Sequence, residues 1–298
     1  MPELPEVETI RLGVQRRLRG RVLTDLLIHS ARAVRHSEPD AFGALAGREV
    51  IEVARRGKFL WLVLEGSPDA LVIHLGMSGQ LLHRSSPPAA PLRHAAATLL
   101  LDDGAALAFV DQRTFGYIRT SPLHATVDGQ PGGEGTELPH VPESVAHIAR
   151  DPLDPHLDVA AAAERMGATS SAIKRVLLDQ RYVSGIGNIY ADEALWSVSV
   201  HPEIPSGALP EDVLWDIVRQ SAEVMRAAVR VGGTSFDSLY VDTDGESGYF
   251  ARELAAYGRR GAPCRRCGTL IEKLVVGGRA TYVCPSCQAR DRLFPTMN

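Results

Sequence analysis

The sequence is poor in lysine, cysteine and aromatic residues, and it has no long apolar run. Of its 298 residues, four are cysteine and 6% are aromatic. No apolar stretch approaches the roughly 20 residues that a membrane helix needs. Residues 1–25 are charged and lack the apolar core of a secretory signal. These absences favour a cytoplasmic protein that does not contact membranes. With 45% hydrophobic residues, the chain can still build ordinary buried cores.

Lysine occurs only at positions 58, 174 and 273, and arginine supplies the rest of the 32 basic residues. A lysine ammonium can shuttle a proton when its surroundings favour this, whereas an arginine guanidinium cannot. Each lysine is therefore a candidate functional residue, although a surface lysine without a function is the more common case.

The cysteines form two C-x-x-C pairs in one short C-terminal segment: Cys264, Cys267, Cys284 and Cys287. This spacing predicts one tetrahedral Zn²⁺ site that holds a small ribbon together. Because four protein ligands leave no open position, we expect the zinc to be structural. Disulfides are the alternative, and they are less expected in a chain without a secretory segment.

The segment around these cysteines is basic. Residues 259–292 carry eight basic and two acidic side chains, within a chain of net charge −4. That contrast favours contact with a phosphate backbone on one face of the protein. A solvated basic hairpin is the other interpretation.

The first part of the chain predicts one helix followed by short strands. Pro5 suits a first helical turn, and an apolar stripe that includes Val7, Ile10 and Val14 predicts a helix over residues 5–18. Apolar runs then predict strands at 22–28, 50–53, 59–64, 71–75 and 98–101, the last turning at 103–104 into 105–110. Short strands in series favour a β-sandwich or barrel.

The second part of the chain predicts helices. Glycine and proline interrupt residues 121–143, which indicates a linker or a mobile surface loop. Helical patterns follow at 159–166, 170–180, 189–198 and 210–231. In the turn at 183–188, glycines allow a close backbone turn, Asn188 can cap the next helix, and unpaired amides would suit an anion. A plain helix connection is the alternative.

The N-terminus offers a nucleophile. Removal of Met1 would leave Pro2 with a secondary amine that titrates near neutral pH. A free amine can attack an electrophilic carbon to form a Schiff base, and Glu3 stands beside it as an acid or base. The competing interpretation is structural, because proline and glutamate are common at helix starts.

Several separated segments together resemble one family. They are residues 1–9 (Met-Pro-Glu-Leu-Pro-Glu-Val-Glu-Thr), 74–79, 184–190, 248–250 and the cysteine ribbon. In this order they are similar to the bacterial formamidopyrimidine-DNA glycosylase family over nearly the whole chain. The Pro-Glu-Leu-Pro-Glu start favours this family over its endonuclease VIII relatives, which usually read Pro-Glu-Gly-Pro-Glu.

The resemblance implies an α+β multidomain fold. We expect an N-terminal β-sandwich catalytic domain with flanking helices (1–125), a linker or extended loop (126–155), a helical domain with a helix-two-turn-helix element and a lesion loop (156–250), and a C-terminal zinc ribbon (251–292). Duplex DNA with oxidised bases would lie in the cleft between the domains. The protein would be a monomer with one structural Zn²⁺, associated with the bacterial nucleoid.

The resemblance also implies a reaction. Pro2 would attack C1′ of a nucleotide carrying 8-oxoguanine or a formamidopyrimidine, with Glu3 managing protons, and β- and δ-elimination would then cut the strand. Lys58 matches the lysine that faces the lesion phosphate, and Arg279 matches the arginine at the tip of the ribbon. Both would neutralise developing negative charge. Glu6 matches a position that supports the site, with a surface glutamate as the plain alternative.

Further positions match DNA contacts of the family. Met77, Arg113 and Phe115 match the wedge of the family: Met77 would fill the void, Arg113 would face the orphaned partner base, and Phe115 would insert between base pairs. Without the resemblance, Met77 and Phe115 would be interpreted as core residues. Asn188 matches a backbone contact, and Lys174 matches a lysine of the helical domain with a less direct role. His74 and His94 are weaker phosphate-contact candidates, since a lone histidine is more often a packing residue.

Departures from the family pattern bear on specificity. Gln112 and Thr114 replace a commoner proline and arginine, Ala96 stands where a histidine is frequent, and Asp237 stands before the expected lesion loop. Two other functions therefore stay open: an endonuclease VIII-like glycosylase for oxidised pyrimidines, and a DNA-binding protein without catalysis.

Overall fold

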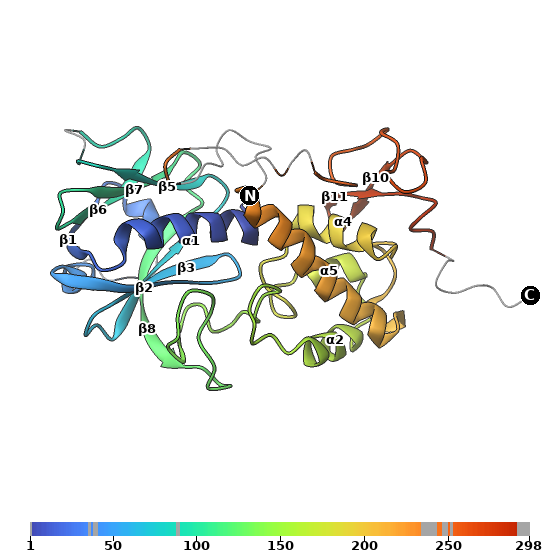
Figure 1. The fold of residues 1–298 in the computed structure, drawn as a ribbon, viewed down its shortest axis with the longest axis horizontal. Helices are drawn as coiled ribbons and strands as arrows, with labels where there is room; N and C mark the ends of the chain where they lie inside the picture. The colour runs from blue at the N-terminus through green and yellow to red at the C-terminus, as the bar shows by residue number, and fades with distance from the viewer. Residues whose placement is uncertain are drawn as a thin grey trace, which may run out of the picture. The chain divides into compact units, whose positions relative to one another are not determined.

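The computed structural model describes residues 2–34, 37, 41–87, 90–233, 243–245, 250 and 253–290, and the chain forms two compact units (Figure 1). Unit 1 comprises Met1–His147 and Val229–Ala251, and unit 2 comprises Ile148–Ala228 and Arg252–Asn298. Residues 126–147, which the sequence suggested as part of a linker, thus belong to unit 1. Asp237, together with residues 246–248 of the expected lesion loop at 243–248, lies outside the described residues.

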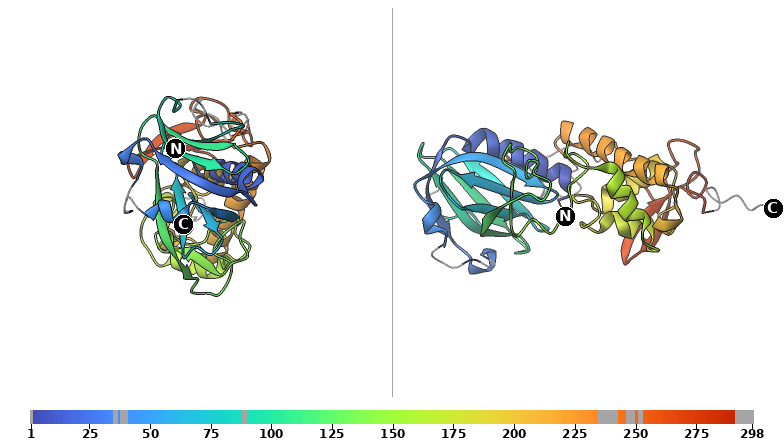
Figure 2. Two further views of the ribbon diagram at one scale, coloured as in Figure 1. Left: turned by 90° about the vertical axis from the view of Figure 1, so that its left-hand side faces the viewer. Right: turned by 90° about the horizontal axis from the view of Figure 1, so that it is seen from below.

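Unit 1 begins with helix α1 (Leu4–Leu18), close to the predicted bounds. The backbone N–H of Glu3 donates to Glu6 Oε2 at 2.8 Å, so the side chain of the third helical residue satisfies a donor at the helix start. The predicted apolar stripe is buried and packs on the sheet, along which α1 runs in Figure 2. Glu3, Glu6 and Glu8 are also buried, which excludes the interpretation of Glu6 as a surface residue.

The sheet of unit 1 has nine strands in the order β5-β7-β6-β1-β2-β3-β4-β8-β9, and every pairing between neighbours is antiparallel. Strands β1 and β2 pair only at Val22–Glu49 and Leu23–Arg48, so the sheet opens there into two halves. Both halves and α1 contribute to one apolar core. The strands are β1 (Val22–Ile28), β2 (Arg48–Arg56), β3 (Phe59–Leu64), β4 (Asp69–His74), β5 (Gly79–Arg84), β6 (Ala95–Leu101), β7 (Ala106–Asp111), β8 (Tyr117–Ala125) and β9 (His140–Pro142).

The glycine- and proline-rich stretch is ordered structure, not the linker or mobile loop that its composition suggested. Strand β8 runs to Ala125, β9 pairs with it, and residues 126–139 form the connection between them. The amide of Gly132 donates to the carbonyl of Leu138 at 2.9 Å, which closes this connection on itself.

Unit 2 contains four α-helices, a short 3-10 helix (Ser206–Ala208) and a two-stranded hairpin among its described residues. The α-helices and strands are α2 (Val159–Gly167), α3 (Ile173–Leu178), α4 (Asn188–Ser197), α5 (Glu211–Arg230), β10 (Glu272–Val276) and β11 (Arg279–Val283). Helix α3 is shorter than predicted, because Asp179 adopts extended backbone angles. The 20-residue helix α5 buries one apolar face. Within the described ranges, no helix is both long and apolar enough to cross a membrane.

Candidate metal centre and nucleic-acid interface

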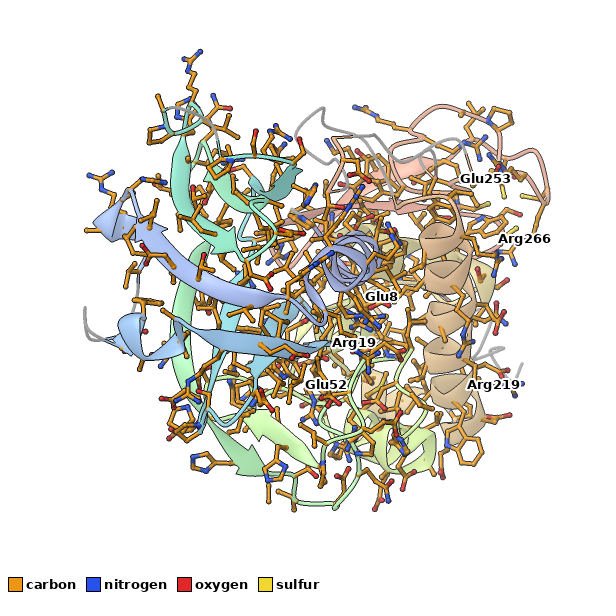
Figure 3. All side chains as sticks on the ribbon, turned by 60° about the vertical axis from the view of Figure 1, so that its left-hand side comes forward. Glu8, Arg19, Glu52, Arg219, Glu253 and Arg266 are labelled. Carbon is orange, nitrogen blue, oxygen red and sulfur yellow. The ribbon has the colours of Figure 1, made fainter. Side chains whose placement is uncertain are left out.

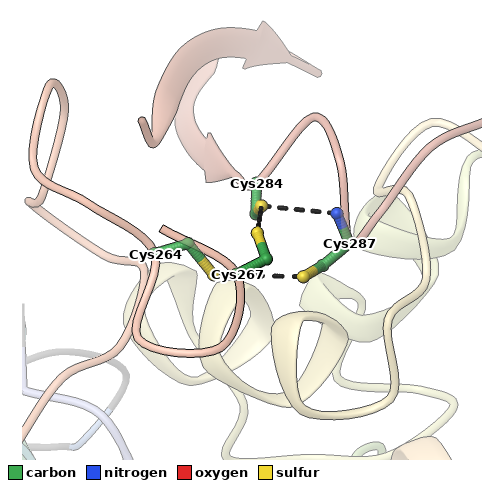
Figure 4. Close-up of side chains that lie close together, drawn as sticks. All are labelled: Cys264, Cys267, Cys284 and Cys287. Atoms are coloured by element: carbon green, nitrogen blue, oxygen red, sulfur yellow. Dashed lines mark hydrogen bonds between the residues drawn. The ribbon is translucent and has the colours of Figure 1, made fainter. Parts of the chain in front are cut away.

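The four cysteines converge in unit 2, and their Sγ atoms all lie within 4.8 Å of one another (Figure 4). The Sγ–Sγ distances are 3.5 Å for Cys267–Cys284 and 4.0 Å for Cys264–Cys287. A disulfide requires about 2.05 Å, whereas four thiolates about 2.3 Å from a central zinc lie nearly 4 Å apart. The cluster therefore fits one tetrahedral Zn²⁺ with every position filled, and the disulfide alternative is excluded.

The metal centre rests on helix α4. Trp196 and Tyr282 pack against the cysteine cluster, and the guanidinium of Arg266 lies 4.1 Å from the centre of the Trp196 ring. Arg266 also donates to the carbonyl of Ser197 at 3.2 Å. Arg266, an exposed residue of the basic ribbon, thus contacts the protein itself and attaches the first C-x-x-C pair to the end of α4.

Lys174 and Asn188 meet at the hairpin that carries Arg279. The Lys174 Nζ donates to Thr281 Oγ1 at 2.8 Å and to the Ala280 carbonyl at 3.1 Å, and Asn188 Nδ2 donates to that same carbonyl at 2.8 Å. Arg279 itself is exposed. Side chains from α3 and α4 therefore bind the backbone of β11 next to Arg279.

The Lys174 side chain is fully buried, and its ammonium lies 2.6 Å from Asp192 Oδ1. Burial raises the pKa of Asp192 to about 7, with the Lys174 charge and the amide of Tyr282 acting in the opposite direction. An ammonium held by these protein groups does not reach a phosphate. The sequence-based assignment of Lys174 as a DNA contact is therefore corrected: the residue supports the ribbon.

The turn at 183–188 differs from the expectation in two ways. Gly187 is the N-cap of α4, and Asn188 is the first helical residue, with its side chain directed to the ribbon and not to the helix start. The amides of Ser184 and Gly185 are taken by the Arg150 carbonyl and by Gln180 Oε1. Neither of these two amides is available to an anion.

In unit 1, the N-terminal residues lead into helix α1, which carries part of a buried charge cluster. Pro2 and Glu3 are both buried, and Gly233 lies against Glu6. One turn further along α1, the Glu8 carboxylate accepts from Arg55 Nε and from Arg11 Nη2, each at 2.7 Å. Figure 3 labels Glu8 on α1.

Glu8 is ionised in this cluster. Burial alone would raise its pKa, but the charges and hydrogen bonds of Arg55 and Arg11 outweigh burial and lower it. The sequence alone does not reveal this cluster, because the burial of Glu8 and Arg55 depends on residues far apart in the chain.

Lys58 lies in the two-residue turn between β2 and β3. Beyond this turn, β3 pairs with β4, and β4 pairs with β8. Phe59 pairs with His74, and His74 pairs with Tyr117. The half-buried His74 ring packs between Phe59 and Tyr117, with centroid distances of 4.8 and 5.4 Å. His74 Nδ1 also accepts from the Gly76 amide at 3.1 Å. These contacts fix the His74 ring at the start of the connection leading to Met77, and its phosphate contact stays a prediction.

The connections that carry Met77 and the Arg113–Phe115 segment run side by side. A Cβ at Gly76 would lie 2.4 Å from the Gly116 nitrogen, so only glycine permits this approach. The Arg113 guanidinium lies 5.3 Å from the centre of the Phe115 ring. Met77 is half-buried, and Phe115 is 48% exposed, which excludes a core role for Phe115.

A buried carboxylate joins these two connections. Asp111 Oδ1 accepts from Ser78 Oγ at 2.5 Å and from the Arg113 amide at 3.2 Å, and Oδ2 accepts from the Gly116 amide at 2.6 Å. Asp111 was not among the candidate residues predicted from the sequence. Nothing in the local pattern shows that one carboxylate would organise two loops.

His94 lies beside the same carboxylate. It is exposed, has a left-handed backbone (φ 62°), and accepts at its carbonyl from the Asp111 amide at 3.0 Å. His94, Asp111 and Thr114 line a cavity of about 190 Å³. Lys58, His74, Met77, His94, Arg113 and Phe115 thus all lie at or next to paired strand ends of one sheet.

Comparison with known proteins agrees with this geometry. Residues 1–118 match the model of the formamidopyrimidine-DNA glycosylase N-terminal domain, residues 148–239 match that of its H2TH domain, and residues 261–290 match a zinc finger found in FPG and IleRS. The formamidopyrimidine-DNA glycosylase of Mycobacteroides abscessus is 48% identical over 293 residues, which cover 97% of this chain and 98% of the relative. The chain belongs to the formamidopyrimidine-DNA glycosylase family.

Solved structures of this family have the same fold. The MutM (FPG) protein of Thermus thermophilus has a TM-score of 0.79 at 34% identity, covering 96% of this chain and 98% of that protein. A mutant Lactococcus lactis FPG, solved in complex with DNA containing Fapy-dG, has a TM-score of 0.81 at 29% identity and covers 97% of this chain and 100% of that protein. The match therefore extends over both units and the ribbon.

Proposed function

We propose that this protein is a DNA base-excision repair glycosylase and AP lyase that removes oxidised purines, 8-oxoguanine and formamidopyrimidines, from duplex DNA. The main support is the full-length family membership. One structural observation adds to it: Lys58, Met77, Arg113 and Phe115 lie at or next to neighbouring strand ends of unit 1.

The proposed chemistry begins at Pro2. After removal of Met1, the proline nitrogen attacks C1′ of the damaged nucleotide, the bond from C1′ to the base breaks, and the base leaves with a proton. Opening of the sugar converts the adduct to a Schiff base. Loss of the 3′ phosphate by β-elimination and of the 5′ phosphate by δ-elimination then cuts the strand. Glu3, buried beside Pro2, is the proposed proton carrier.

The remaining residues have proposed roles in holding the DNA. Lys58 and the exposed Arg279 bind the lesion phosphate and offset its developing charge. Met77, Arg113 and Phe115 enter the helix where the damaged base has left the stack. His94 and Asn188 contact the backbone, while Lys174 positions the ribbon. Zinc supplies no chemistry here and only holds the ribbon that presents Arg279.

Single-turnover cleavage on matched duplexes tests this function. We expect fast strand cleavage at 8-oxoguanine or formamidopyrimidine opposite cytosine, slow cleavage at an oxidised pyrimidine, and none on undamaged DNA. Preference for the oxidised pyrimidine would favour the endonuclease VIII-like alternative. Tight binding without cleavage of any substrate would favour the non-catalytic alternative.

Its location is also a proposal. The relatives are bacterial proteins, and a DNA repair activity requires access to the chromosome. Association with the nucleoid in the cytoplasm follows from the proposed substrate, and imaging of a C-terminal fluorescent fusion against stained DNA checks it.

A further inference from the structure

The connection between β8 and β9, residues 126–139, makes contacts that its composition did not predict, and we call it the brace loop. It lies along the edge of β2 that β1 leaves open after Val50. The amide of Arg55 donates to the Glu134 carbonyl and the amide of Glu134 donates to the Arg55 carbonyl, both at 2.9 Å. The loop therefore acts as a short antiparallel neighbour for the end of β2.

Side chains add to this backbone pairing. Arg56 Nε donates to the Gly132 carbonyl at 2.8 Å, and Glu52 accepts from the Thr136 hydroxyl and from the Glu137 amide. Glu52 is labelled on β2 in Figure 3. The side chain of Arg55 is fully buried and that of Arg56 is nearly so. The brace loop thus supplies partners to a strand end that would otherwise bury unpaired polar groups.

The glycines of the loop make this approach possible. A Cβ on Gly133 would lie 2.2 Å from the Arg55 carbonyl oxygen and 2.9 Å from the Trp61 ring, and one on Gly135 would lie 2.5 Å from the Val53 carbonyl oxygen. By contrast, a Cβ on Gly129 at the exposed tip would meet no atom within 4 Å. The contact with β2 therefore depends on particular glycines, not on general flexibility.

A chain of contacts leads from the loop to Lys58. Arg55, paired with Glu134, directs its guanidinium to Glu8 and donates from Nη1 to the Gly57 carbonyl at 3.1 Å. That carbonyl belongs to the peptide bond that joins Gly57 to Lys58, in the turn after β2. The same strand end is therefore fixed on one side by α1 and on the other by the brace loop.

We propose that the brace loop is a positioning element for Lys58, which it holds in place through Arg55 and the Gly57–Lys58 peptide. This inference rests on the proposed role of Lys58 at the lesion phosphate. It gives a function to a stretch that composition alone marks as a linker. The glycines and Thr136 are then positioning residues and do not touch DNA.

A double-mutant cycle tests this inference in the full-length enzyme. Gly133→Ala should slow single-turnover strand cleavage at saturating enzyme by roughly 10-fold to 100-fold, the size expected when a reacting group is displaced by about 1 Å. Gly43→Ala makes the same change at an exposed glycine of unit 1 that has no positive φ and whose Cβ would meet no atom within 4 Å, and it should remain within about twofold of wild type. In a Lys58→Ala background, Gly133→Ala should add less than about twofold, because the residue being positioned is gone.

The outcomes distinguish a failure of the positioning role of the brace loop from a failure of the proposed role of Lys58. If Gly133→Ala slows cleavage equally in both backgrounds, the loop acts independently of Lys58 and the inference is overturned. If Lys58→Ala alone cleaves like wild type, the proposed role of Lys58 fails and takes the inference with it. Should Gly133→Ala not fold, Thr136→Val removes the bond to Glu52 and the acceptor of the Leu138 amide with little change of shape. It should slow cleavage only where Lys58 is present, and Thr136→Ser should restore the rate; an unchanged rate for Thr136→Val would overturn the inference.

Discussion

At the scale of single residues, buried carboxylates hold the loops that are proposed to meet DNA. Asp111 accepts from Ser78, Arg113 and Gly116, and Glu8 accepts from Arg11 and Arg55. Hydrogen bonds to a charged group contribute about 1.5–3 kcal/mol each, more than neutral ones. Such residues fix geometry without contacting substrate.

Replacing Asp111 with asparagine should loosen the wedge. The amide keeps one acceptor but loses the charge, and its NH₂ group cannot accept from the amide of Gly116. We expect weaker unstacking at the lesion, seen as a smaller rise in the fluorescence of a 2-aminopurine placed beside 8-oxoguanine, and slower excision by about tenfold. A fluorescence rise equal to that of wild type would contradict this role of Asp111.

Arg113 should determine the choice of the opposite base. A guanidinium offers only donors, and an estranged cytosine presents two acceptors at O2 and N3, whereas adenine is a poorer match. Excision of 8-oxoguanine should therefore be much faster opposite cytosine than opposite adenine. Arg113→Ala should reduce that ratio by about 10-fold to 100-fold, the equivalent of a charged hydrogen bond of about 1.5–3 kcal/mol. Single-turnover rates on both pairings decide it, and equal wild-type rates would refute the role.

His201 should make stability depend on pH. Burial, together with the charge of Arg290, lowers its pKa to about 4, and its Nδ1 accepts from the Glu203 amide at 3.2 Å. Between pH 6.5 and 4 the unfolded chain takes up a proton that the folded chain does not, so the free energy of unfolding falls as pH falls. His201→Asn keeps an acceptor without this titration. Thermal unfolding from pH 7 to 4 should show a smaller loss for the variant, and parallel curves would contradict the assignment.

At the scale of elements, those with local sequence signals were predicted well, and those that depend on partners far away in the chain were not. Helix α1 and strands β1 and β3 were predicted closely, because apolar periodicity and Pro5 are local signals. Strand β5 was missed, since Gly79, Gln80 and His83 dilute its alternation, and its conformation depends on pairing with β7. The brace loop was misjudged for the same reason: its partners lie about 80 residues away along the chain.

The candidate site shows the same division. The cysteine spacing was sufficient to predict the metal centre, because the number of ligands and their spacing along the chain can be read directly from the sequence. Asn188 and Lys174 could be selected by resemblance, but their partners in β11 could not, since those contacts form only after the ribbon folds against α3 and α4. The sequence thus predicted which residues belong to the site better than it predicted the partners that these residues contact.

The ribbon should fold only with its metal. The described hairpin has two short strands, and its apolar core consists mainly of the cysteines and Ile271. Chelation or Cys267→Ser should therefore release one Zn²⁺ per chain, change the emission of Trp196, and weaken DNA binding, since Arg279 loses its support. The sheet of unit 1 should persist by circular dichroism. Unchanged DNA affinity in a zinc-free protein would contradict the role of the ribbon.

At the scale of the whole molecule, each unit contains its own set of the proposed site residues. Unit 1 contains Pro2, Lys58 and the loops of Met77 and Arg113, held by Asp111 and by the charge cluster around Glu8. Unit 2 contains the metal centre and the grip of Lys174 and Asn188 on the hairpin of Arg279. The brace loop belongs to unit 1, as does Lys58, which it is proposed to position.

The most direct test of the central claim is borohydride trapping of the enzyme on a duplex with 8-oxoguanine opposite cytosine. The Schiff base on Pro2 should be reduced in place, giving one covalent protein–DNA species whose linked residue, located by mass spectrometry after proteolysis, is the N-terminal proline. An enzyme with a residue added before Pro2 should form none. If that extended enzyme, or Pro2→Gly with linkage at Lys58, trapped and cleaved as well as wild type, the assignment of Pro2 as the nucleophile would be wrong.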